Sequence, residues 1–228
     1  MPDFVIEKPA VVAIPVAGSD SLFPVRRVYC IGRNYAAHAI EMGHDPDREP
    51  PFFFQKNPDN LDPSGRFPYP PKTADVHHEV EMAVALGSGG TNIALARALE
   101  HVYGYAVALD MTRRDLQGEA KRLGRPWEIG KAFERSAPIG MLHPAAEVCH
   151  PEAGRIHLGI NGDVRQDGDL NQMIWKVPEM ISYLSEYFDL AAGDVILSGT
   201  PSGVGPVRRG DRIEAAIEGL GELGVEVT

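Results

Sequence analysis

The sequence predicts a protein of the α+β class that is mainly β, with a few short helices. Two observations favour this class. Apolar runs rich in Val, Ile and Phe alternate with Gly- and Pro-containing turns along all 228 residues. Only four segments combine helix-forming residues with apolar side chains spaced three and four positions apart. No internal repeat and no break in composition argues for a second domain.

The N-terminal part contains two predicted strands, a short helix and a loop. Residues 4–16 and 25–31 are dominated by Val, Ile and Phe, with turn residues between them. Helix-forming residues occupy 35–42, and Gly43 ends that helix. The proline-broken segment 43–51 cannot continue a helix, so we expect a loop there, which is a candidate lid.

The middle of the chain alternates strands and helices. Aromatic residues predict a short strand at 51–56, and mostly apolar runs predict strands at 77–86 and 103–109. Residues 92–101 have helical composition and spacing, with Thr91 or Asn92 as the cap. A polar, basic helix is expected at 111–122.

The C-terminal part begins with a hairpin. Asn161-Gly162 follows the apolar run 156–160 and is the typical pair of a tight hairpin turn. Residues 177–188 carry an apolar stripe and predict a helix whose stripe joins the core. The strand within 193–205 leads into a glycine-rich turn whose backbone N–H groups can approach an anion. The alternating segment 211–227 predicts further strands.

Composition and charge exclude several classes of protein. The net charge is −10 and no basic stripe is visible, so we expect no nucleic-acid partner. The apolar run 10–16 is too short to span a membrane and is broken by Pro15, so we expect no membrane partner. Two cysteines without a CxxC pair, and a start without a signal peptide, predict a reducing compartment and a cytoplasmic location.

A group of carboxylates is the strongest candidate for chemistry. Side chains of a strand alternate between its faces, so Glu79 and Glu81 point the same way. If the strand that ends before Asp110 lies beside the first, Asp110 is a third carboxylate at the same place. Such an all-oxygen set favours Mg²⁺, Mn²⁺ or Ca²⁺ over Zn²⁺. The alternative is an exposed strand with solvated glutamates.

Other polar residues allow both a functional and an ordinary interpretation. His38 and Glu41 share a helix face, where a carboxylate can orient an imidazole that acts as a general base, or the two form a solvated surface pair. Arg114 and Gln117 also share a face next to the third carboxylate, where an anionic substrate needs donors; a solvated helix face is the alternative.

Two lysines also allow two interpretations each. Lys131 stands between a glycine and apolar residues, so it is either a partly desolvated electrostatic clamp or the cap of a loop. Lys56 ends the aromatic strand and either extends to water or faces an anionic ligand.

Five motifs in one order resemble the fumarylacetoacetate hydrolase superfamily, over residues 25–227. They are Gly32-Arg-Asn-Tyr-Ala-Ala-His38, His78-Glu-Val-Glu81, Leu109-Asp-Met-Thr112, Pro126-Trp-Glu-Ile-Gly-Lys-Ala-Phe133 and Ser198-Gly-Thr-Pro-Ser-Gly-Val-Gly-Pro206. The resemblance implies a mixed β-sandwich roll, usually a homodimer, with a single catalytic domain at 1–228. Residues 1–24 would then form an N-terminal strand extension and 25–228 the hydrolase core.

The resemblance also implies roles for individual residues. Glu79, Glu81 and Asp110 would hold Mg²⁺ or Mn²⁺, a site that Ca²⁺ can take in crystals. The catalytic residues it implies are the water-activating pair His38 and Glu41, together with Lys131. The residues implied to contact a keto-acid substrate are Arg114, Gln117, Thr200 and Lys56.

Within the superfamily, two phrases are most similar to the fumarylpyruvate hydrolases. They are Pro50-Pro-Phe-Phe-Phe54 and Gln166-Asp-Gly-Asp-Leu-Asn-Gln-Met-Ile-Trp175. The expected reaction is metal-dependent C–C cleavage of an acylpyruvate, fumarylpyruvate to fumarate and pyruvate, in aromatic (gentisate) catabolism. Oxaloacetate decarboxylation or a 2-hydroxymuconate-type isomerisation at the same site remains an alternative, as does a non-catalytic keto-acid-binding protein.

Overall fold

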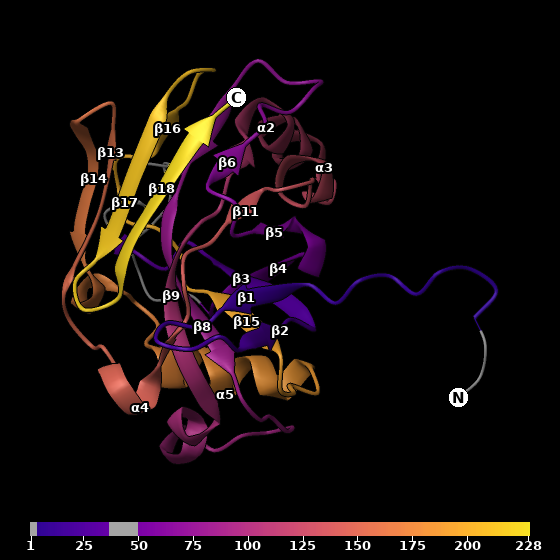
Figure 1. The fold of residues 1–228 in the computed structure, drawn as a ribbon, viewed down its shortest axis with the longest axis vertical. Coiled ribbons are helices and arrows are strands. Elements are labelled where there is room, and N and C mark those ends of the chain that lie inside the picture. The colour runs from indigo at the N-terminus through magenta and orange to yellow at the C-terminus, as the bar shows by residue number, and fades with distance from the viewer. Residues whose placement is uncertain (1–3, 37–49) are drawn as a thin grey trace.

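The computed structural model describes residues 4–36 and 50–228 and confirms a mainly β fold with a few short helices (Figure 1). Four α-helices are described: α2 (Arg114–Leu123), α3 (Glu128–Lys131), α4 (Ala145–Val148) and α5 (Val177–Tyr187). Three 3₁₀ segments accompany them: η1 (Pro58–Asn60), η2 (Leu95–His101) and η3 (Leu170–Gln172).

The central layer is a six-stranded mixed sheet. Its order is β12 (His143–Pro144), β9 (Val102–Leu109), β8 (Val80–Leu86), β15 (Asp194–Leu197), β3 (Arg27–Gly32) and β4 (Phe52–Lys56). β15 and β3 run parallel, and the other neighbours are antiparallel. Every residue of β8 is buried, so this strand is covered on both faces.

A second, five-stranded sheet packs on this layer and makes the fold a sandwich (Figure 1). Its order is β14 (Asp163–Asp169), β13 (Arg155–Ile160), β17 (Arg212–Ile217), β18 (Gly221–Val227) and β6 (Arg66–Phe67). The main core lies between the sheets: Met82 and Val84 of β8 share one cluster with Leu158 of β13 and Val225 of β18. Ala83 and Ala85 point to the opposite face and join a second cluster.

Three small sheets complete the strand set. The one that matters for the site is three-stranded, in the order β10 (Thr112–Arg113), β7 (Val76–His78) and β16 (Gly205–Pro206). The two-stranded sheets pair β1 (Ala13–Pro15) with β2 (Leu22–Pro24), and β5 (Leu61–Asp62) with β11 (Ala137–Pro138).

Several predicted elements are confirmed. The hairpin turns at Asn161 and Gly162, whose φ angles of 53° and 89° are the left-handed values that such a turn requires. α5 buries Met180, Ile181 and Leu184 in the main core, as its stripe predicts. β17 and β18 account for the alternating C-terminal segment.

Other predicted boundaries are wrong. Only residues 13–15 of the predicted 4–16 strand pair with another strand, and the exposed residues 4–11 lead away from the body of the molecule (Figure 1). The predicted helix at 92–101 is the shorter 3₁₀ segment η2. The helix predicted from residue 111 begins at Arg114, because residues 112 and 113 pair with β7 as strand β10. Residues 37–42 of the predicted helix at 35–42 lie outside the described residues.

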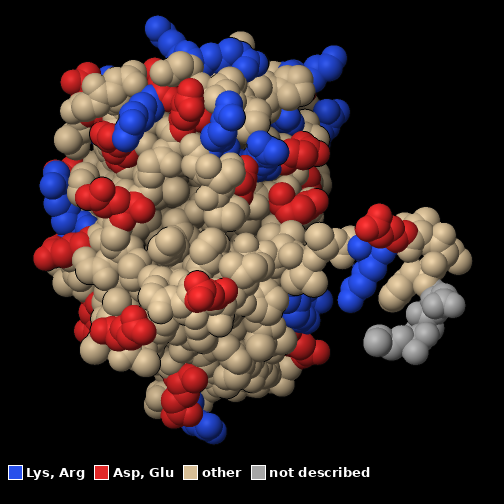
Figure 2. Space-filling model, viewed as in Figure 1, with Lys and Arg blue, Asp and Glu red and all other residues tan. Residues whose placement is uncertain are grey.

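The surface agrees with the charge pattern of the sequence. Figure 2 shows one face on which acidic and basic side chains are interspersed around a broad area without charge. No helix among the described residues is long and apolar enough to cross a bilayer.

Candidate metal centre

Three acidic side chains from different parts of the chain meet at one end of the central sheet. β8 and β9 are antiparallel, with Val80 opposite Leu109, so the residue before β8 faces the residue after β9. The Asp110 N–H accordingly donates to the Glu79 carbonyl at 2.9 Å. Glu79, Glu81 and Asp110 are all buried, and their carboxylates offer oxygen atoms that lie within 4.8 Å of one another.

The strand predicted at 77–86 is broken at Glu79, which the sequence did not indicate. β7 pairs with β10 and β16, whereas β8 pairs with β9 and β15 in another sheet. Glu79 lies between the two strands and belongs to neither. The carboxylates of Glu79 and Glu81 nevertheless converge, so the break places the site where two sheets join.

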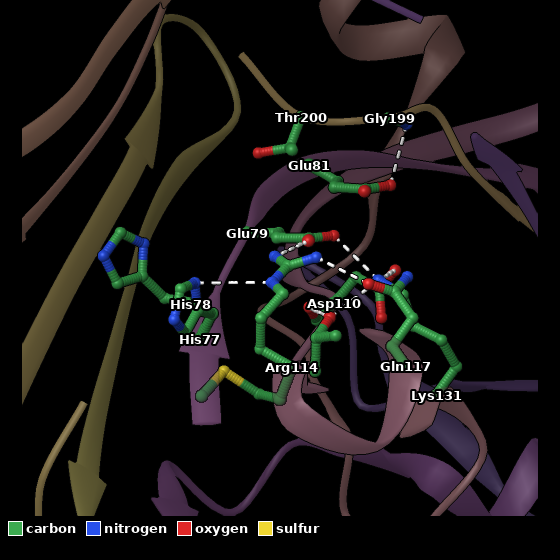
Figure 3. Close-up of polar contacts among 12 residues, drawn as sticks. His77, His78, Glu79, Glu81, Asp110, Arg114, Gln117, Lys131, Gly199 and Thr200 are labelled. Carbon is green, nitrogen blue, oxygen red and sulfur yellow. Dashed lines mark hydrogen bonds and ion pairs between the residues drawn. The ribbon is translucent and has the colours of Figure 1, made fainter. Parts of the chain in front are cut away.

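Glu81 receives a backbone hydrogen bond from the glycine-rich turn. The Gly199 N–H donates to Glu81 Oε2 at 2.8 Å (Figure 3), so the anion approached by this turn is a side chain of the protein itself. Gly199 has a φ of +91°, and a Cβ added there would come within 2.7 Å of the Asn34 Cβ. The turn therefore requires glycine at this position.

The Glu81 carboxylate is in electrostatic conflict with its surroundings. Burial, and then the neighbouring Asp110 and Glu79 carboxylates, raise the pKa of Glu81 well above its ordinary value. None of the described residues forms a salt bridge with it. A divalent cation among the three carboxylates would remove this conflict, and oxygen donors suit a hard ion such as Mg²⁺ or Mn²⁺. The residues present therefore fit a metal ion.

Two lysines lie beside the carboxylates. Lys131 Nζ is 2.8 Å from Glu79 Oε2 and 2.6 Å from both Asp110 Oδ2 and Thr112 Oγ1. Burial lowers the pKa of Lys131, but Asp110 and Glu79 raise it, and the net pKa is above the ordinary value. Lys56 Nζ lies 2.9 Å from Asp110 Oδ1. Both lysines are buried, so neither caps an exposed loop or extends to water.

The start of α2 lies against the same carboxylates. The Arg114 guanidinium forms an ion pair with Glu79 and donates to Gln117 Oε1 at 2.8 Å (Figure 3). This spacing of three residues on one helix face is the one predicted from the sequence. Thr200 lines the same pocket from the glycine-rich turn.

Gln166 of β14 was quoted from the sequence only within a motif and was given no role in the site. Its amide Nε2 donates at 2.8 Å to Thr200 Oγ1 and to the Pro201 carbonyl, and its Oε1 accepts from the Val80 N–H at 3.0 Å. His78 Nδ1 donates to the same Oε1 at 3.0 Å. Because Thr200 Oγ1 accepts from Gln166, its own proton is available to donate into the pocket.

Gln166 escaped notice because its strand carries no apolar alternation. β14 reads Asp-Val-Arg-Gln-Asp-Gly-Asp, and Gln166 is its one buried residue. A polar residue at an inward position looks like its exposed neighbours when the register is unknown.

The carboxylates and their partners line one pocket. Its lining residues are Ile31, Gly32, Arg33, Phe52, Phe54, Glu79, Glu81, Asp110, Arg114, Gln117, Lys121, Trp127, Lys131, Gly199 and Thr200. Lys56 lies behind this wall, in contact with Asp110. His38 and Glu41, the predicted water-activating pair, lie outside the described residues.

The fold and the acidic site define a class of enzyme, and the comparison with known proteins agrees. Residues 27–228 match the family model described as fumarylacetoacetate (FAA) hydrolase C-terminal. The chain belongs to this family of enzymes, and the resemblance drawn from its motifs is confirmed.

Individual relatives carry two different activities in their names. A crystal structure of fumarylpyruvate hydrolase from Pseudomonas aeruginosa, in complex with Mn²⁺ and pyruvate, is 54% identical with a TM-score of 0.97 and covers 99% of both chains. Oxaloacetate tautomerase FAHD1, mitochondrial, of Arabidopsis thaliana is 42% identical over 88% of this chain and 90% of its own. Oxaloacetate tautomerase YcgM of Escherichia coli is 41% identical over 86% of this chain and 90% of its own.

Proposed function

We propose that this protein is a metal-dependent hydrolase that cleaves the C–C bond of an acylpyruvate, converting fumarylpyruvate to fumarate and pyruvate. The observation that carries the proposal is the buried set of Glu79, Glu81 and Asp110, in one pocket with Arg114 and Thr200. The relative that is 54% identical, a fumarylpyruvate hydrolase, supports this choice of substrate. The role would belong to aromatic (gentisate) catabolism.

The side chains around the carboxylates suit the keto-acid end of such a substrate. Arg114 and Gln117 present donors, and the Thr200 hydroxyl keeps its proton for the pocket. Mg²⁺ or Mn²⁺ held by the three carboxylates would supply Lewis-acid polarisation of the keto-acid oxygens. We assign binding and orientation of the substrate carboxylate to the three donor residues.

Water activation would come from the segment outside the described residues. His38, oriented by Glu41, removes a proton from water, and the water oxygen forms a bond to the acyl carbonyl carbon. Lys131 stabilises the negative charge that develops on the carbonyl oxygen. The bond between the acyl carbonyl carbon and the pyruvoyl methylene then breaks, and its electron pair leaves as the enolate of pyruvate. A proton then adds to the former methylene carbon and gives pyruvate.

Steady-state assays test the proposal directly. The purified chain is assayed with fumarylpyruvate and acetylpyruvate, with Mg²⁺, with Mn²⁺, and after treatment with a chelator. We expect release of pyruvate that is lost on chelation and restored by either metal. Absence of pyruvate release under all of these conditions contradicts the proposal.

A second candidate is tautomerisation of oxaloacetate, favoured by the names of the relatives that are 41–42% identical. It uses the same enolate chemistry but needs no attack by water. His38→Ala separates the two: loss of hydrolysis with oxaloacetate turnover retained supports the water-activating role of His38. Retention of both activities would contradict that role.

We also propose that the enzyme is a cytoplasmic homodimer, by its resemblance to the family.

A further inference from the structure

A row of two aromatic rings between two cations forms one side of the pocket. The Arg33 guanidinium carbon lies 5.3 Å from the centroid of the Phe52 ring, and Lys121 Nζ lies 4.9 Å from that of Trp127. The two rings meet edge to face, with centroids 5.4 Å apart. Each of the four side chains lines the pocket. The distances are those of cation–π and edge-to-face contacts, so the row holds both cations in place.

The backbone at the start of this row is built for close contact. A Cβ at Gly32 would collide with the Phe52 ring, so only glycine lets the end of β3 lie against that ring. Arg33 has a φ of +58°, a left-handed conformation that is uncommon for residues other than glycine. Such conformations cluster at functional sites. The direction of the Arg33 side chain is therefore set by its backbone as well as by Phe52.

The cations of the row differ from those around the acidic residues in their pairing. Lys56, Lys131 and Arg114 each form an ion pair with Glu79 or Asp110. Neither Arg33 nor Lys121 has an ion-pair partner in the part of the chain that the structure describes. Two pocket cations without an ion-pair partner among the described residues, in a protein with a net charge of −10, mark a place for an anionic group.

The surroundings of Lys121 are electropositive. Burial lowers its pKa to about 8, and the positive charges of Arg114, Arg33 and Lys131 contribute to the same shift. A carboxylate bound between Arg33 and Lys121 would reverse the effect of these like charges.

Aromatic rings connect this corner to the acidic residues. Lys131 Nζ lies 5.1 Å from the centroid of the Phe54 ring, and that ring lies 5.8 Å from Trp127. The pocket wall thus runs from the ammonium of Lys131 along Phe54 and Trp127 to Lys121. A flat, unsaturated chain with a charge at each end matches this order of charge, aromatic surface and charge.

We propose that Arg33 and Lys121 bind the carboxylate at the far end of the acyl chain, so that the enzyme selects acylpyruvates that carry a second carboxylate. The proposal rests on the proposed hydrolase function, because it assigns the opposite, keto-acid end of the substrate to Arg114, Gln117 and Thr200. It adds a specificity site that distinguishes dicarboxylic from monocarboxylic 2,4-dioxo acids.

A pair of substrates and a pair of variants test the site. Fumarylpyruvate carries the far carboxylate, and acetylpyruvate has a methyl group instead. Lys121→Met and Arg33→Met are assayed with Mn²⁺ on both substrates. Loss of one charge-assisted hydrogen bond predicts a fall in kcat/KM for fumarylpyruvate of about 10- to 100-fold. The fall for acetylpyruvate should be no more than about threefold, which is within roughly 0.7 kcal/mol.

Matched controls separate this effect from general damage. Arg122 lies next to Lys121 on α2, is exposed and does not line the pocket, so Arg122→Met should keep the wild-type preference between the substrates. Lys121→Arg keeps the charge and should retain most of the fumarylpyruvate activity. Thermal unfolding of each variant checks that the fold is intact.

Two outcomes overturn the proposal: equal losses on both substrates, or no loss on either. If the wild-type enzyme turns over neither compound, the hydrolase function fails separately. Because both compounds then stay intact, their binding can be measured by calorimetry. A Kd for fumarylpyruvate that is unchanged in Lys121→Met and Arg33→Met overturns the specificity site. A Kd that increases for fumarylpyruvate but not for acetylpyruvate supports it.

Discussion

The carboxylate of Glu81 illustrates how single residues at this site are matched to a ligand. It is buried with two other carboxylates, and among the described residues it accepts a hydrogen bond from the backbone N–H of Gly199. Such a group destabilises the metal-free protein and becomes favourable when a cation binds. Its contribution to stability therefore changes sign with metal occupancy.

Glu81→Gln should separate these two effects. The amide oxygen can still accept from Gly199, but the buried charge is gone, so the metal-free variant should unfold at a temperature equal to or above that of the metal-free wild type. Wild-type protein with Mn²⁺ at 100 times its Kd should gain about 2.7 kcal/mol. The variant should lose most of this gain. Calorimetric unfolding with and without Mn²⁺ measures both, and an unchanged Mn²⁺ gain would contradict the assignment of Glu81 as a ligand.

Lys121 gives a prediction about pH. Its pKa of about 8 means that it is charged below pH 8 and loses its charge above it. The KM for fumarylpyruvate should therefore rise as the pH increases through about 8. The charged neighbours of Lys121 are Arg114, Arg33 and Lys131, which lower its pKa, and Glu79, which raises it. The pKa of Lys131 lies above its ordinary value.

The control for this pH effect is Lys121→Arg, because arginine stays charged. In that variant the rise in KM near pH 8 should disappear. Acetylpyruvate should show no such rise with either protein. A rise of the same size in the arginine variant would assign the titration to another group.

At the scale of elements, the glycine-rich turn after β15 contacts one of the three carboxylates, because its Gly199 N–H donates to Glu81. Gly199→Ala would force its Cβ against Asn34 and require a left-handed alanine. We expect a loss of about 1–3 kcal/mol in the free energy of unfolding and weaker Mn²⁺ binding. Gly210→Ala is the matched control, because Gly210 has a φ of +88° but no atom within 4 Å of its Cβ position. Equal effects of the two substitutions on Mn²⁺ affinity would show that the Gly199 contact does not matter.

Gln166 connects β14 of the five-stranded sheet to β8 and to the same turn. Gln166→Leu leaves the buried Val80 N–H and Pro201 carbonyl without this partner, so it should cost about 2–4 kcal/mol of stability.

Gln166→Glu nearly conserves the shape but removes the amide donor to Thr200. It should raise KM more than it lowers kcat if Thr200 binds substrate. A fall in kcat alone, at unchanged KM, would argue against that role.

For the whole molecule, the N-terminal arm bears on assembly. Residues 4–11 lead away from the body, and Phe4, Val5, Ile6 and Val11 are exposed (Figures 1 and 2). Apolar side chains on such an arm gain burial only against another surface. We expect light scattering to give twice the chain mass of 24.8 kDa, and deletion of residues 1–11 to weaken the dimer. A monomeric wild-type chain would contradict the homodimer.

Much of this architecture follows from local patterns. Asn161-Gly162 specifies its hairpin, the stripe of α5 specifies its buried face, and the adjacency of the strands before Asp110 and after Glu79 brings the acidic residues together. The hairpin and the buried face depend on neighbours in sequence, so the sequence alone predicts them. The adjacency of the two strands is the condition on which the prediction of a third carboxylate depended, and the structure supplies it.

The remaining features depend on partners far along the chain. The break at Glu79 arises because β7 pairs with β10 and β16 instead of continuing beside β9. Gln166 becomes important only when β14 lies over Thr200. Lys121 is a different case: it is seven residues after Arg114 and four after Gln117, so helical periodicity would have placed it on their face.

The position of Trp127 also provides an optical signal. The chain contains two tryptophans, and this one lies 4.9 Å from the Lys121 ammonium in the wall of the pocket. Indole emission responds to nearby charge, so occupation of the pocket should change the fluorescence of the unlabelled enzyme. Rapid mixing could then follow substrate arrival in real time, with Trp127→Phe as the silent reference.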